Sequence, residues 1–557
     1  MNFAYIEMKV KFYKGEIKLK LMRLLSLVFI VAFSMLVVTA CNSDKPATTE
    51  EPSEKKEPVT EKKEPEKEEP TFKPLVVAIE AEPTSLDPHN ATDTNSATVQ
   101  SVMLEGLLAF DESMNLVKML ATDYSFNDTA TEITFELREG VTFHDGTPFN
   151  AEVVKVNLDF VRDRDNGMAR ASFFSFIDEV IVNNDYSVTV RSKEPNSAMA
   201  SYLAHSAAAF KSIDEVNKKI EDLDYNADRN PVGTGPFKFL EWRDSAHVKV
   251  VPFDNYWNEE GKAKVESITF KPVVESSTRV NMLKTGEVDI VFPLPTLIAD
   301  EFESDPNIDV FTGSSTEAFY VGINVSLDKY QDVRVRKAMN HAVNKDALIA
   351  LVLDGYGQVL NSAIAPAVYG YDPQEIYEFD QDQAKTLLEE AGVGEGFDAV
   401  LWTRNSTEFL TVAENVAIQL SAIGINVDVQ AYETGTLFDM LDAGDGTDLF
   451  IGRWSPGTGE ADWGLRPNFA SDRIPPNYNN AGYYTNEELD QLFNDALRSP
   501  DQDETLRIYA EAQKVIFDDA PWIFLYVPDT IIAKRSELKG ITVRATGAVV
   551  LTGAWKE

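Results

Sequence analysis

The body of the chain alternates short apolar runs with longer amphipathic stretches. Residues 75–79 form a run rich in β-branched side chains, which is typical of a buried strand. Residues 133–137 alternate apolar and polar positions and predict a half-buried strand. From Ala151 to Val161 the apolar positions recur with helical spacing and predict an amphipathic helix. This alternation predicts an α/β fold.

Further helices are predicted later in the chain, over residues 334–353, 384–391 and 410–423. Gly392 and Gly424 follow the second and third of these segments directly. Glycine is favoured at this position because it adopts the left-handed conformation that closes a helix without steric cost. The same pattern of strands and helices continues to the end of the chain.

The first part of the chain has a different character. Residues 24–40 carry no charge, follow a lysine-rich segment and are followed directly by Cys41. A positive segment, an apolar segment and a cysteine after small or aliphatic residues resemble a bacterial lipoprotein signal peptide, with Cys41 as the lipidated residue. The next residues, 41–74, repeat Glu-Lys-Lys-Glu-Pro units and contain almost no apolar side chain, so we expect a disordered tether.

Composition excludes several functions. The net charge of -40 is spread along the chain, which argues against binding to nucleic acid because phosphates need a concentrated basic surface. A single cysteine excludes intrachain disulfides and cysteine-built metal sites. The five histidines form no HExxH pattern, and no GxSxG, P-loop or GxGxxG motif occurs. These patterns give no support for an enzyme, and we expect no metal or cofactor.

Several ordered segments resemble the peptide/nickel/opine family of solute-binding proteins, which serve ABC importers. They include residues 135–149 (FELREGVTFHDGTPF), 232–237 (VGTGPF), 332–343 (DVRVRKAMNHAV) and 520–523 (APWI). The resemblance extends from about residue 75 to the end of the chain. It names a fold and a class of function, and not a ligand.

The resemblance implies two α/β lobes joined by crossing strands, with an extra subdomain inserted in the first lobe. Ligand would be enclosed between the lobes by hinge closure. The implied division is a signal peptide (1–40), a lipidated tether (41–74), a first lobe (75–109, 230–312 and 521–557), an inserted subdomain (110–229) and a second lobe (313–520).

Residues 452–467 (GRWSPGTGEADWGLRP) resemble the glutathione-binding subgroup of this family. The resemblance implies that Asp462 holds the ammonium group of a peptide ligand. A dry cleft accepts a zwitterion only if its charges meet partners, so carboxylates of the ligand need cationic side chains. The candidates are Arg404, Arg453 and Arg466, while Trp402, Trp454 and Trp463 either stack on the ligand or fill the core.

The expected function is capture of glutathione or a similar small peptide and its delivery to the permease of an ABC importer. We expect a monomer held by the lipid on Cys41 at the outer face of the cytoplasmic membrane. The alternatives are a binding protein for other short peptides, opines or a nickel chelate, a surface hydrolase and a ligand sensor. Residues 204–210 (AHSAAAF) contain no arginine, which disfavours the nickel chelate.

Overall fold

The computed structural model describes residues 72–222, 225–444, 446–476 and 479–557. The expected signal peptide, Cys41 and most of the expected tether lie outside these residues. No helix in the described ranges is both long enough and apolar enough to cross a bilayer.

The first lobe is built around a central strand, β1 (Leu75–Ile79), whose side chains are almost all buried, as the sequence predicts. This strand pairs in parallel with β10 on one side and β11 on the other. The other strands of this part of the sheet are antiparallel to their neighbours. The remaining elements are β8 (Phe237–Arg243), β9 (His247–Pro252), β10 (Ile268–Pro272), β11 (Ile290–Val291), β12 (Ile308–Ser314), α2 (Thr94–Gln100), α6 (Ser276–Thr285) and α7 (Thr296–Glu303).

A separate antiparallel sheet with strand order β4-β5-β7-β6 follows the first lobe's opening segment, and its own apolar core packs under α3. Asn150 caps α3 by accepting a hydrogen bond from the Val153 amide, and the predicted apolar face is buried. The elements are β2 (Leu108–Phe110), β3 (Leu116–Lys118), β4 (Ala121–Phe126), β5 (Glu132–Leu137), α3 (Ala151–Arg162), β6 (Ile177–Asn184), β7 (Ser187–Ser192), α4 (Met199–Ala204) and α5 (Ile213–Glu221). We refer to this region as the inserted subdomain.

The second lobe surrounds strands in the order β16-β15-β17-β13, and apolar clusters line its two faces. Its strands are β13 (Ala318–Ile323), β14 (Gly357–Val359), β15 (Phe397–Arg404), β16 (Ile425–Tyr432) and β17 (Leu449–Trp454). Its helices are α8 (Val333–Ala342), α9 (Lys345–Val352), α10 (Gln381–Glu390), α11 (Thr407–Ser421), α12 (Thr434–Ala443), α13 (Ala461–Phe469), α14 (Glu487–Arg498) and α15 (Gln502–Asp519).

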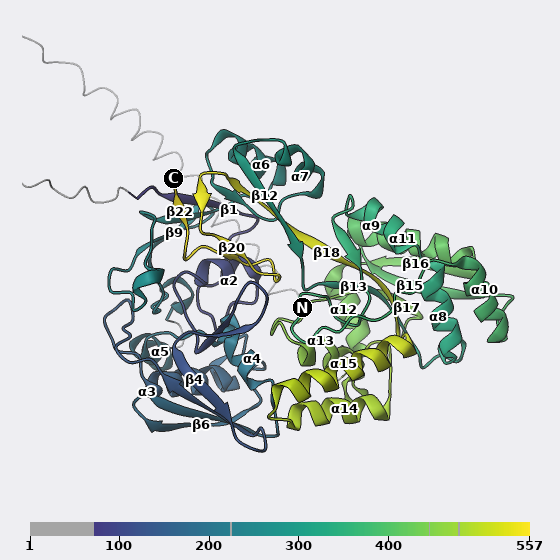
Figure 1. Ribbon diagram of the computed structural model, residues 1–557, viewed down its shortest axis with the longest axis horizontal. Helices are drawn as coiled ribbons and strands as arrows, with labels where there is room; N and C mark the ends of the chain where they lie inside the picture. Colours follow the sequence, from purple (N-terminus) through teal and green to yellow (C-terminus); the bar gives the residue numbers. More distant parts are fainter. Residues whose placement is uncertain (1–71, 223–224, 445, 477–478) are drawn as a thin grey trace, which may run out of the picture. The chain divides into compact units, whose positions relative to one another are not determined.

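One long strand, β18 (Trp522–Arg535), belongs to both lobes (Figure 1). Its first residues, from Trp522, pair with β13 of the second lobe, and the stretch from Asp529 to Arg535 pairs with β12 of the first lobe. The chain ends with β19 (Leu538–Lys539), β20 (Thr542–Val543), β21 (Val549–Val550) and β22 (Trp555–Lys556). The α/β class and the two lobes joined by crossing strands are confirmed, while the residue boundaries of the division stay predictions.

The predicted single helix over residues 334–353 is wrong. The structure divides it into α8 and α9, because Val343 leaves the helical conformation and the Asn344 side chain accepts a hydrogen bond from the Ala347 amide as a new N-cap. The two other predicted helices are present but begin three residues earlier, at Gln381 and Thr407.

Candidate functional site

Two glycines allow β13 and β17 to carry large rings across the second lobe's sheet. A Cβ atom on Gly452 would lie 2.2 Å from the Tyr320 ring, and one on Gly322 would lie 2.2 Å from the Phe450 ring. Only glycine fits beneath these rings. The rings therefore pack on the strands, and β17 delivers Arg453 and Trp454 at its end.

A cavity of about 330 Å³ in the second lobe brings three of the candidate residues together. Arg404 comes from the end of β15, and Arg453 and Trp454 come from β17. No sequence motif marks the other side chains of this cavity as ligand-binding; they include Tyr320, Phe438, Asp442, Asn468 and Asn479. We call it the arginine cavity.

The two guanidinium groups of the arginine cavity differ in their partners. Arg404 lies over the rings of Phe409 and Phe438, 4.4 Å and 5.0 Å from their centroids, and its buried Nε atom has no hydrogen-bond partner in the described part of the chain. Burial, and next the charge of Arg453, lowers the pKa of Arg404. Arg453 forms a long ion pair of 3.7 Å with Glu317. Arg404 is therefore the guanidinium with more unused capacity for a carboxylate.

Asp462 and Arg466 form an internal ion pair one turn apart on α13. Asp462 Oδ1 accepts hydrogen bonds of 2.8 Å from Arg466 Nε and 2.8 Å from the Tyr509 hydroxyl. Arg466 also donates to the Phe493 carbonyl at 2.6 Å. Burial lowers the pKa of Arg466, but the nearby Asp462 carboxylate outweighs this effect, so the pKa of Arg466 is raised overall. Arg466 does not line the arginine cavity, and the Asp462 carboxylate already has two donors.

Glu460 precedes this pair and caps α13. Its carboxylate accepts hydrogen bonds from the amides of Asp462 and Trp463, at 2.7 Å and 3.0 Å, and from the Thr458 hydroxyl at 3.0 Å. Burial, followed by the nearby Asp462 carboxylate, raises the pKa of Glu460 to about 7. Both carboxylates of the neighbouring Glu460 and Asp462 therefore have defined partners.

The three candidate tryptophans take different positions. Trp402 is buried and packs edge to face on Tyr432, with 5.6 Å between the ring centroids. Trp454 lines the arginine cavity and donates from Nε1 to the Trp463 carbonyl at 3.1 Å. The Trp463 ring lies edge to face with Tyr202 of the inserted subdomain, 5.8 Å away. Trp402 thus fills the core and Trp463 joins the second lobe to the inserted subdomain.

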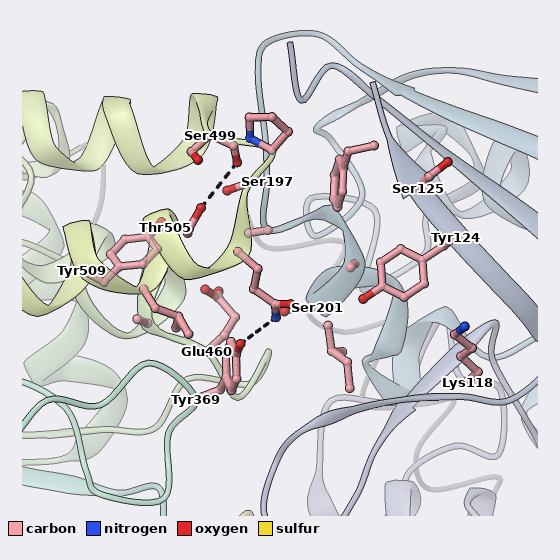
Figure 2. A pocket seen from close by; sticks show the side chains of 18 of the residues that line it. Lys118, Tyr124, Ser125, Ser197, Ser201, Tyr369, Glu460, Ser499, Thr505 and Tyr509 are labelled. Carbon is pink, nitrogen blue, oxygen red and sulfur yellow. Dashed lines mark hydrogen bonds between the residues drawn. The ribbon is translucent and has the colours of Figure 1, made fainter. Parts of the chain in front are cut away.

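A second cavity, of about 440 Å³, lies between the inserted subdomain and α15 (Figure 2). Its lining is rich in hydroxyl groups, and Glu460 and Tyr369 approach it from the second lobe while Tyr124 and Ser125 approach from β4. The Tyr369 hydroxyl accepts a hydrogen bond of 2.6 Å from Gln502. No group of three or more histidine, cysteine, aspartate or glutamate residues suited to a metal occurs in the residues that the structure describes.

Two lobes linked by crossing strands, with polar and aromatic cavities near the region where they meet, define a ligand-binding protein of the two-lobe type. Residues 115–475 match the family described as bacterial extracellular solute-binding proteins, family 5. The chain belongs to this family.

Known relatives agree with this assignment. The chain is 35% identical to the glutathione-binding protein GsiB of Pectobacterium atrosepticum over 476 residues, which cover 85% of this chain and 92% of the relative. It is 34% identical to GsiB of Escherichia coli strain K12 over the same coverage. Among solved structures, HbpA2 from Haemophilus parasuis matches with a TM-score of 0.80 at 24% identity, covering 87% of this chain and 100% of the other. The periplasmic binding protein DppA from Helicobacter pylori, in complex with the peptide STSA, matches with a TM-score of 0.71 at 26% identity, covering 87% and 99%.

Proposed function

We propose that the protein binds glutathione or a similar small peptide between its lobes and delivers it to the permease of an ABC importer. The observation that carries this proposal is the 34–35% identity to glutathione-binding proteins over 85% of the chain. The arginine cavity supports it, because a ligand with two carboxylates needs cationic partners when it leaves water. The proposed role is binding and release, without catalysis.

In this proposal Arg404 and Arg453 bind a carboxylate of the ligand, and the Trp454 ring packs against the peptide backbone. The buried Nε atom of Arg404 has no hydrogen-bond partner among the described residues, so a bound carboxylate would give this donor an acceptor. Stacking of both guanidinium groups near the Phe409 ring, 4.4 Å and 5.9 Å from its centroid, holds them in place.

Four other candidates receive a supporting role. The internal ion pair of Asp462 with Arg466 leaves less capacity for a ligand ammonium group than the sequence suggests, so we propose that this pair holds α13 in position. Trp402 and Trp463 pack against protein side chains. The ligand's ammonium partner is then one of the other acidic groups near the cavities, such as Asp442 of the arginine cavity.

We further propose that a lipid on Cys41 anchors a monomer at the outer face of the cytoplasmic membrane. The apolar segment before Cys41 and the charged, proline-containing segment after it support this placement. A protein held in this way meets its ligand outside the cell and stays close to the permease.

The test is isothermal titration of the purified protein with reduced glutathione, oxidised glutathione, a dipeptide, an opine and a nickel-histidine mixture. Saturable binding of reduced glutathione alone supports the proposal. A response to another compound without a response to glutathione rejects glutathione as the ligand and retains the binding protein.

Variants of the arginine cavity make the test specific. We expect Arg404→Gln to weaken glutathione binding by roughly 10- to 100-fold, because a charge-assisted hydrogen bond contributes about 1.5 to 3 kcal/mol. The matched control is Arg243→Gln, since the Arg243 side chain on β8 is 67% exposed and pairs with Glu241 of its own strand. Equal affinities of the two variants would contradict the role of Arg404.

A further inference from the structure

A third cavity, of about 340 Å³, lies where the first lobe, the inserted subdomain, the second lobe and the C-terminal segment meet. Arg170 and His205 come from the inserted subdomain, Asp93 from the first lobe and Arg544 from the C-terminal segment. The second lobe contributes Ser455, Pro456 and Gly457. We call it the interlobe cavity.

Two arginines of the interlobe cavity have unused donors. Arg170 donates from Nε to the Ala91 carbonyl at 2.8 Å, and its two terminal nitrogens make no hydrogen bond to any described residue. The Arg544 side chain makes none at all to the part of the chain that the structure describes, and its Nε atom is fully buried. Burial lowers the pKa of both groups. Guanidinium donors without a protein partner in a partly buried cavity can donate to an anionic ligand.

The lining of the cavity holds two arginines, one carboxylate and one neutral histidine, so it keeps an excess of one positive charge. The Asp93 carboxylate already accepts hydrogen bonds from the Ser96 amide and hydroxyl and from the Thr84 hydroxyl. Burial, and next the charge of Arg170, lowers the pKa of His205 to about 3, so His205 is neutral at physiological pH. Asp111 faces Arg544 without a hydrogen bond to it, and its carboxylate binds the Ser113 and Asn115 amides. An anion is therefore the ligand that this cavity favours.

The second lobe closes the interlobe cavity at one place. The Ser455 hydroxyl lies 2.7 Å from that of Thr316, and a Cβ atom on Gly457 would lie 3.4 Å from His205 Nε2. Residues 455–457 follow directly after Arg453 and Trp454, which line the arginine cavity. This segment therefore links the linings of the two cavities in sequence.

We propose that Arg170 and Arg544 form a carboxylate subsite, so that a ligand with two carboxylates places one in the interlobe cavity and the other near Arg404 and Arg453. This inference rests on the proposed function and extends it to the ligand's charge pattern. A peptide with a single carboxylate can satisfy only one of the two cavities. Because the interlobe cavity needs residues of both lobes, its occupancy also favours the closed arrangement.

The experiment measures affinities for three ligands: glutathione, glutathione ethyl ester, which lacks the glycyl carboxylate, and 4-aminobutyryl-cysteinyl-glycine, which lacks the carboxylate of the γ-glutamyl residue. Full-length wild-type protein and Arg544→Gln are compared by titration calorimetry. We expect the variant to bind glutathione roughly 30-fold or more weakly. One of the two carboxylates is the one that Arg544 binds in the wild type. We expect Arg544→Gln to bind glutathione and the ligand that lacks this carboxylate with equal affinity.

Stability separates a binding role from a structural one. Since Arg544 is half-buried and its buried Nε atom has no hydrogen-bond partner among the described residues, Arg544→Gln without ligand should melt at or above the wild-type temperature, while its stabilisation by glutathione should shrink. Arg544→Lys keeps the charge and should recover part of the affinity, and Arg170→Gln should repeat the loss.

Two outcomes overturn the inference while glutathione binding by the wild type stands. One is wild-type affinity of Arg544→Gln and Arg170→Gln, and the other is an equal loss for all three ligands. If the wild-type protein binds none of the three, the proposed function itself fails, and the subsite falls with it.

Discussion

Replacing Asp462 by asparagine tests whether this residue forms a structural ion pair or contacts the ligand. The Asp462 and Arg466 side chains are only 6% and 13% exposed, and their charged atoms lie 2.7 Å apart. Asp462→Asn keeps an acceptor for the Tyr509 hydroxyl but leaves the Arg466 charge buried without a counter-charge. Breaking a buried pair by removal of one partner costs about 3 to 5 kcal/mol. We expect about 3 kcal/mol here, because asparagine retains one hydrogen bond.

The assay is urea unfolding of a double-mutant cycle made of Asp462→Asn, Arg466→Met and both together. The double variant removes both charges, so it should recover at least about 2 kcal/mol relative to the sum of the single changes. Asp518→Asn is the matched control, since Asp518 pairs with Lys514 one turn away on α15 and both side chains are more than half exposed. That change should stay within about 0.5 kcal/mol of the wild type.

Titration with glutathione completes the comparison. If Asp462 and Arg466 form a structural pair, Asp462→Asn should be less stable than the wild type. At temperatures where the variant is folded, it should keep most of its affinity for glutathione. Wild-type stability combined with a loss of affinity of roughly 30-fold, the cost of an orphaned ligand charge, would refute this reasoning and restore Asp462 as the ammonium partner.

Two further predictions concern Glu460 and the anchor. The pKa of Glu460 rises from 4.5 in the unfolded chain to about 7 in the folded one. Protonated Glu460 therefore contributes stability that is fully present below pH 4.5. This contribution is lost as pH rises through 7. The unfolding free energy of the wild type minus that of Glu460→Gln should therefore fall by about 2 to 3 kcal/mol between pH 5 and pH 8; parallel pH profiles in urea unfolding would exclude this. Cys41→Ala should release the protein from the membrane fraction or leave the signal peptide uncleaved, and unchanged detergent partitioning would argue against a lipid on Cys41.

The elements that the sequence predicts well are those whose pattern is set by one dominant interaction. The strand β1 is apolar because it is buried, and α3 shows its buried face at helical spacing. The break between α8 and α9 was missed because a cap by Asn344 competes with a helical pattern that continues on both sides. Local capping is a smaller signal than periodicity, so the longer helix was predicted instead.

Site residues were harder to place, because the sequence indicates which side chains can bind a peptide and not which are already engaged. The spacing of Asp462 and Arg466, one helical turn, was a visible sign of an internal pair. No comparable sign linked Arg170 with Arg544, which lie in distant segments and meet only through the packing of the lobes.

The charge of the whole protein and the charge of its cavities have opposite signs. A net charge of -40 repels an anionic ligand, but at physiological ionic strength this repulsion is screened beyond about 8 Å. Inside the cavities screening is weaker, and Arg404, Arg170 and Arg544 keep donors that no described residue satisfies. The Arg466 charge, by contrast, is already neutralised by Asp462. Selection for carboxylates therefore depends on a few half-buried arginines whose donors are not all used by the described residues. An acidic residue introduced beside these arginines should weaken carboxylate binding more than a change of surface charge.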